Sequence, residues 1–178
     1  MRAALRALRR AGLSTVMAVA AALAALLPAG LAAQEQRPPL NAGRVAAEVV
    51  VGAYAGIGGF VIGRFVGEGL SDAIGVGAED TRRNVGRATG FVVAGLATAG
   101  TVYGIGNIGD ETGDFDVTAL GTGVGFIAAL AIARVALGPN VGTDRKMGAK
   151  GRWLTINALA LLPAVGATVG FNSSRRIR

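Results

Sequence analysis

The chain contains no cysteine and no histidine, and these two absences exclude much of the chemistry that side chains perform. Without cysteine there are no disulfides and no thiolate nucleophiles, and without histidine there is no Ser-His triad. Most zinc, copper and iron sites use one of these residue types as a ligand. We therefore expect no catalytic residue, no cofactor and no metal site, and we expect that the protein is not an enzyme.

Charged and aromatic residues are also scarce. Charged residues make up 16% of the 178 residues, against about 25% in an average soluble domain. Hydrophobic residues reach 52%, which excludes a disordered chain. Glycine is abundant, with 29 residues, but it follows no three-residue period, which excludes a collagen-like triple helix. The composition therefore predicts a membrane protein whose partner is the lipid bilayer, with no identifiable small-molecule substrate.

The formal net charge of +7 comes largely from the start of the chain. Four arginines precede an uncharged apolar run over residues 11–34: Arg2, Arg6, Arg9 and Arg10. A basic start, an apolar run and small residues before a polar segment are typical of a secretory signal. We expect residues 1–33 to be a signal peptide and residues 34–43 a linker; an uncleaved first membrane helix is the alternative. No basic stripe with interleaved aromatic residues remains, so no nucleic-acid partner is expected.

Four long apolar blocks follow the linker and are separated by polar loops. They cover residues 45–67, 88–109, 117–138 and 153–174. We expect residues 44–174 to form a single membrane domain and residues 175–178 a basic tail. Trp153 follows Arg152 directly, and we expect it to be an interfacial anchor, because tryptophan favours the boundary between lipid and water.

Small residues recur at helical spacing within the blocks. Residues four apart share one face of a helix, and small residues at this spacing let two helix backbones approach closely in lipid. The glycines that we expect to pack helices together are Gly52, Gly56, Gly59, Gly63, Gly67, Gly121, Gly125, Gly166 and Gly170. The predicted fold class is an all-α membrane protein with about four Gly/Ala-rich transmembrane helices after a signal peptide.

The alternative fold is an eight-stranded outer-membrane β-barrel, in which each block forms a hairpin. The ending Val169-Gly170-Phe171-Asn172 suits a strand, and glycine is costly inside helices, by about 1 kcal/mol relative to alanine. Against the barrel, the blocks show no clean alternation of apolar and polar residues, and aromatic residues are too few for two girdles. Alanine and glycine are also poor strand residues. The helical fold is favoured.

Charge placement indicates which loops share a side of the membrane. The loop at 110–116 carries four acidic residues and no base, whereas the loop at 145–152 is basic. The positive-inside bias places these loops on opposite sides, with the acidic loop outside. The tail at 175–178 also falls outside and departs from that bias. We expect the acidic loop to be solvated, and we expect Arg44 with Glu48, and Arg64 with Glu68, to be ion pairs at the ends of the first block.

A G-x-G-x-x-G pattern runs from Gly104 to Gly109, but no strand–turn–helix unit surrounds it and two acidic residues follow directly. We interpret it as the glycine-rich end of a membrane span and not as a nucleotide site.

The repeat Gly59-x-x-x-Gly63-x-x-x-Gly67 behind a signal-like leader resembles the small glycine-zipper membrane proteins of bacterial envelopes. The segment from Gly104 through Thr118 to Gly125 has the same character. The resemblance implies a structural or stress-related envelope component, oligomeric and without catalysis, although this chain has four blocks where the simplest members have two. The expected function is a non-enzymatic integral membrane protein with a structural or scaffold role. A homo-oligomer is a candidate partner, and the inner membrane is favoured unless the fold is a barrel, which would act as a small outer-membrane pore or scaffold.

Overall fold

The computed structural model describes residues 40–75, 78–137 and 149–177. Four helices and two short strands make up most of these residues: α2 (Ala42–Ala73), α3 (Glu79–Gly106), β1 (Glu111–Thr112), α4 (Phe115–Leu137), α5 (Ala149–Ser174) and β2 (Arg176–Ile177). The predicted signal peptide at 1–33 and most of the predicted linker at 34–43 lie outside the described residues. Of the predicted basic loop at 145–152, residues 145–148 lie outside the described residues and residues 149–152 form the start of α5.

The all-α prediction is confirmed, and the barrel alternative is wrong. Each apolar block forms one long helix and not a hairpin, and Val169–Asn172, which suits a strand by sequence, lies in the last turns of α5. A helix satisfies its backbone hydrogen bonds within a single segment, and the many alanines favour it. Three helices are long and apolar enough to cross a membrane, namely α2, α3 and α4. The described apolar part of α5, Leu159–Ser174, is shorter.

Two helix boundaries differ from the sequence prediction. The mixed-charge stretch between blocks 45–67 and 88–109 is almost entirely helical, because α2 continues to Ala73 and α3 begins at Glu79. Ion pairs one turn apart, Arg64 with Glu68 and Arg83 with Glu79, support these polar helix ends. The acidic start of α3 also complements the positive end of its helix dipole.

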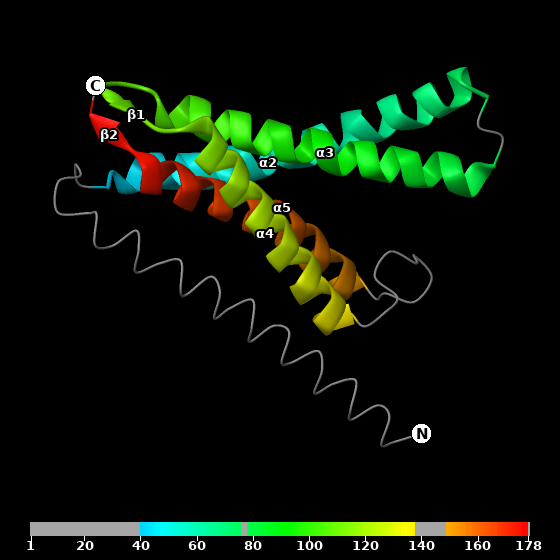
Figure 1. Ribbon diagram of the computed structural model, residues 1–178. Helices are drawn as coiled ribbons and strands as arrows, with labels where there is room; N and C mark the ends of the chain where they lie inside the picture. The colour runs from blue at the N-terminus through cyan, green and yellow to red at the C-terminus, as the bar shows by residue number, and fades with distance from the viewer. Residues whose placement is uncertain (1–39, 76–77, 138–148, 178) are drawn as a thin grey trace.

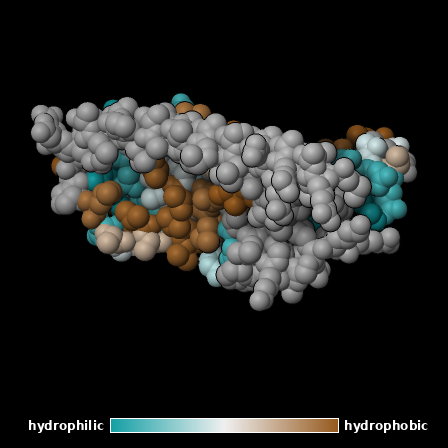
Figure 2. Space-filling model, turned by 90° about the horizontal axis from the view of Figure 1, so that it is seen from below, coloured by the Kyte–Doolittle hydropathy of each residue, from teal (hydrophilic) through white to brown (hydrophobic). Residues whose placement is uncertain are grey.

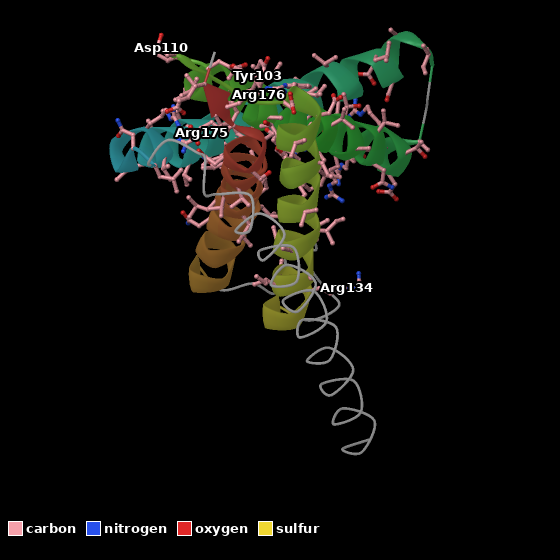
Figure 3. The ribbon with its side chains drawn as sticks, turned by 60° about the vertical axis from the view of Figure 1, so that its left-hand side comes forward. Tyr103, Asp110, Arg134, Arg175 and Arg176 are labelled. Carbon is pink, nitrogen blue, oxygen red and sulfur yellow. The ribbon has the colours of Figure 1, made fainter. Side chains whose placement is uncertain are left out.

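The helices form two antiparallel hairpins, α2–α3 and α4–α5, which meet at one end of the molecule (Figure 1). From that end the hairpins diverge, and Figure 3 shows α4–α5 running steeply away from α2–α3. The start of α2, the end of α3 and the end of α5 gather where the hairpins meet. There β1 pairs antiparallel with β2, with Glu111 opposite Ile177.

Small residues fill the interior, and large apolar residues lie outside. The buried hydrophobic residues are mostly alanines, whereas Phe65 exposes 71% of its surface. Large exposed apolar side chains occur on all four helices. Among the coloured residues in Figure 2, apolar side chains form a patch left of the centre, and hydrophilic side chains lie beside that patch and near the right-hand end. This distribution is the reverse of that in soluble proteins, where large apolar residues form the core.

Candidate functional site

Charged side chains from three distant segments meet where the two hairpins join. Arg44 Nε lies 3.3 Å from Glu48 Oε1, and Arg44 Nη2 lies 2.5 Å from Glu111 Oε2. Arg175 Nη1 lies 3.1 Å from the same Glu111 oxygen. Asn172 donates a hydrogen bond of 3.1 Å from Nδ2 to Glu48 Oε2. We call these five residues the junction network.

The local folding of each segment explains why these side chains meet. Arg44 and Glu48 are four residues apart in the first turns of α2, so they share one face. Asn172 lies in the last turn of α5 and Arg175 directly follows that helix, whose end lies beside the start of α2. Glu111 belongs to β1, and the pairing of β1 with β2 holds it next to Arg175. The network therefore joins α2, the loop before α4 and the segment around Arg175.

Two further contacts fix the loop to the chain end beside the network. The backbone N–H of Asp114 donates to Ser174 Oγ at 2.9 Å. Arg176 Nη2 lies 2.7 Å from Asp114 Oδ1. Two acidic residues of the predicted acidic loop thus pair with the tail arginines Arg175 and Arg176.

The junction network is buried and balanced in charge. The side chain of Glu48 is 0% exposed, that of Arg175 2% and that of Glu111 19%. Two arginines face two glutamates, so every buried charge meets one of opposite sign. Burying an uncompensated charge is very costly, so these four charged side chains can be buried only because they pair with one another. The arrangement is suited to holding segments together and offers no isolated acid, base or nucleophile.

The burial of Glu48 and the partial burial of Glu111 correct the sequence interpretation. Arg44 and Glu48 do form the predicted pair, but Glu48 points into the protein and not toward an interface. Part of the acidic loop at 110–116 is likewise enclosed, since Glu111 contacts two arginines. Sequence analysis did not identify Asn172 and Arg175 as partners of these glutamates. The available signal was that the unmatched acidic loop and the unmatched basic tail were both expected on the same side.

An aromatic cluster lies next to the network. Phe171 of α5 is fully buried, with its ring centroid 6.3 Å from that of Tyr103, which in turn lies 5.5 Å from that of Phe115. A Cβ added to Gly113 would lie 2.5 Å from the ring of Phe171, and one at Gly106 would collide with it too. The G-x-G-x-x-G pattern therefore holds a helix end, as interpreted from sequence, because α3 ends at Gly106 and Gly109 takes a φ of +94°.

The five predicted packing glycines of α2 all face α3. A Cβ added to Gly63 would lie 2.9 Å from Gly90 Cα, and one added to Gly67 would lie 2.9 Å from Gly86 Cα. At Gly59 the added atom would come within 2.9 Å of the Val93 carbonyl oxygen. Gly52 and Gly56 instead face side chains, those of Val102 and Thr98.

The four predicted glycines of α4 and α5 face each other's backbone. A Cβ added to Gly121 would overlap the carbonyl oxygen of Gly166, and a Cβ added to Gly166 would overlap that of Gly121. Gly125 and Gly170 likewise face carbonyl oxygens, of Leu162 and Val117. Trp153 lies in the first turns of α5, and its side chain, the predicted interfacial anchor, lies outside the described residues.

Within the described residues, no group of three or more Asp, Glu, His or Cys side chains is placed to hold a metal ion. Comparison of the chain with protein-family models, with curated proteins and with solved structures finds no match. The resemblance to glycine-zipper proteins therefore stays a prediction, and the functional inference rests on geometry.

Proposed function

We propose that the chain is a non-enzymatic integral membrane protein of a bacterial cell envelope, with a structural or scaffold role that depends on glycine-mediated helix packing. The observation that supports this most strongly is the placement of small residues in the helix contacts and of large apolar residues on the outside. In water, such a surface would be one extended exposed apolar patch. In lipid it is the expected surface, since the acyl chains solvate it.

The same distribution supports packing through glycine. Between helices in lipid there is no hydrophobic driving force, because lipid tails are as apolar as leucine. Association then depends on close van der Waals contact, which small residues allow. All nine predicted glycines lie where an added Cβ would meet a neighbouring helix.

The junction network supports the predicted sidedness. With four crossings, the start of α2, the loop before α4 and the end of α5 come to the same side of the membrane, and these are the segments that the network joins. The tail arginines depart from the positive-inside bias, but Arg175 and Arg176 are paired with acidic side chains. A helical fold with this charge placement favours the inner membrane.

Membrane fractionation tests this proposal. The chain is expressed in a bacterium, and the membranes are washed with alkaline carbonate, which releases peripheral proteins. We expect the protein to stay in the pellet, to enter the supernatant only with detergent, and to sediment with the inner membrane in a density gradient. Release by carbonate alone would contradict the proposal.

A further inference from the structure

The far end of the α2–α3 hairpin, residues 64–75 and 78–87, combines an apolar face on one helix with a polar face on the other. We call this part the hairpin tip. On α2 the exposed apolar side chains continue through Phe65, Val66 and Leu70 to Ile74, with Leu70 59% and Ile74 69% exposed. On α3 the exposed residues of the tip are almost all polar: Glu79, Asp80, Thr81, Arg83, Asn84 and Arg87.

The register of the hairpin shows that these two faces lie at the same level. Gly63 faces Gly90 and Gly67 faces Gly86. The register is therefore antiparallel, and a residue four positions later on α2 lies opposite a residue four positions earlier on α3. Continuing this register places Leu70 beside Arg83 and Asn84. The ion pair of Arg82 with Asp72, at 3.2 Å, agrees with it. At each height along the tip, the exposed side chains of α2 on this face are therefore apolar while those of α3 are polar.

The charged residues of α2 do not interrupt its apolar face. Arg64, Glu68 and Asp72 are spaced four apart and form a separate flank. This flank turns toward α3: the stem of Glu68 packs on Gly86, and Asp72 pairs with Arg82. The tip thus has a lipid-like side on α2 and a water-like side that includes α3. Figure 2 shows hydrophilic and hydrophobic side chains adjoining at this end of the molecule.

Helix length gives a second, independent reason for an inclined hairpin. With 32 residues, α2 is about 48 Å long, whereas the hydrocarbon core of a bilayer is about 30 Å thick. A helix that is too long for the core tilts. The hairpins also diverge steeply, so when α4–α5 stands across the membrane, α2–α3 is strongly inclined (Figure 3).

We propose that the hairpin tip rests obliquely in the membrane surface, with the apolar face of α2 against the acyl chains of the bilayer and α3 against headgroups and water. This inference rests on the proposed membrane location. The occupant of the α2 face is lipid because that face is continuous with the apolar surface of the rest of α2, which the bilayer covers. The exposed charges of the α3 face, Glu79, Asp80, Arg83 and Arg87, balance one another, so anionic headgroups are not required.

Spin labels on single cysteines test this arrangement in phosphatidylcholine vesicles, and the absence of native cysteine makes each label unique. Leu70→Cys and Asn84→Cys lie at the same level on α2 and α3. We expect the label at position 70 to collide mainly with dissolved oxygen, as a label in lipid does. We expect the label at position 84 to collide with a water-soluble nickel complex at least several-fold more often than the label at position 70 does. An upright hairpin gives both positions the same depth and would overturn the inference.

The matched controls are Ile57→Cys and Leu96→Cys, which are exposed and level with each other in the middle of the hairpin. Both are expected to report lipid. If both report water, the proposed membrane location itself fails. If both report lipid while positions 70 and 84 both report water, only the oblique tip fails. Shielding of position 70 from both reagents, with dipolar broadening between labels, would assign this face to a second copy and overturn the inference.

Discussion

The two hairpins use the same small residue in different ways. In α4–α5, Gly121 and Gly166 each face the other's carbonyl oxygen, so glycine meets glycine and backbone meets backbone. In α2–α3, the glycines nearest the junction face side chains, with Gly56 opposite Thr98 and Gly52 opposite Val102. The comparison shows that the spacing of glycines along one helix does not determine whether they meet backbone or side chains on the facing helix.

This difference determines what a substitution meets. A backbone carbonyl is held by its helix and moves little, whereas a side chain on the facing helix rotates or shifts by a few tenths of an ångström. We therefore expect the contact between α4 and α5 to be destabilised by any atom added at a glycine that faces the other helix. In α2–α3 we expect the cost of an added atom to vary along the length of the contact. The junction network matters for both hairpins, because it connects α2 to the end of α5.

The largest effect is expected from Glu111→Gln, which removes the carboxylate that both Arg44 and Arg175 contact. Breaking a buried ion pair costs about 3–5 kcal/mol, and we expect about 3 kcal/mol here because Glu111 is 19% exposed. Thermal unfolding in detergent, followed by circular dichroism, measures the loss. The exposed Asp110→Asn is the control, in the same loop (Figure 3), and is expected to change stability by at most about 0.5 kcal/mol. Equal melting of the two variants would show that the network does not hold the hairpins together.

Gly166→Ala should be the next most damaging change, because its Cβ overlaps the carbonyl oxygen of Gly121. Overpacking costs about 1–3 kcal/mol, which exceeds the gain of about 1 kcal/mol in helix propensity. The melting temperature is therefore expected to fall. A Gly166→Ala protein that melts higher than the parent would contradict backbone contact between α4 and α5.

Gly56→Ala tests the other hairpin with the same added atom. Its Cβ would lie 2.5 Å from Thr98 Oγ1, the end of a side chain that can rotate. The gain in helix propensity then offsets most of the cost, and we expect a change within about 1 kcal/mol. The same melting assay measures it. Destabilisation as large as that of Gly166→Ala would remove the distinction between the hairpins.

The smallest effect, of opposite sign, is expected for glycines that face no other helix. Gly100 of α3 and Gly123 of α4 have no heavy atom within 4 Å of an added Cβ. Substitution by alanine should stabilise each helix by up to about 1 kcal/mol, because glycine is costly in helix interiors. A rise in melting temperature for both variants is the expected result. A fall for either would indicate a contact with another molecule at that face.

The sequence predicted the helices better than it predicted the charged residues. Composition favoured helices over strands, and the four-residue spacing from which we expect Gly63 and Gly166 to pack helices is likewise a local signal. The pairing of Glu111 with Arg44 and Arg175 joins segments that are far apart in the chain, and no local pattern carries it. The helical continuation through Glu68 and Glu79 was missed because charge was taken as the boundary of a helix, when it marks only the boundary of an apolar surface.

The most direct test of the central claim, that the helices cross a membrane with the junction at one side, is cysteine labelling of two exposed positions. Asp110 lies beside the junction, and Asp80 lies at the opposite end of the α2–α3 hairpin. In bacterial spheroplasts, a membrane-impermeant maleimide should label Asp110→Cys fully and should label Asp80→Cys only after the membrane is permeabilised. Equal labelling of both positions in intact spheroplasts would contradict the account.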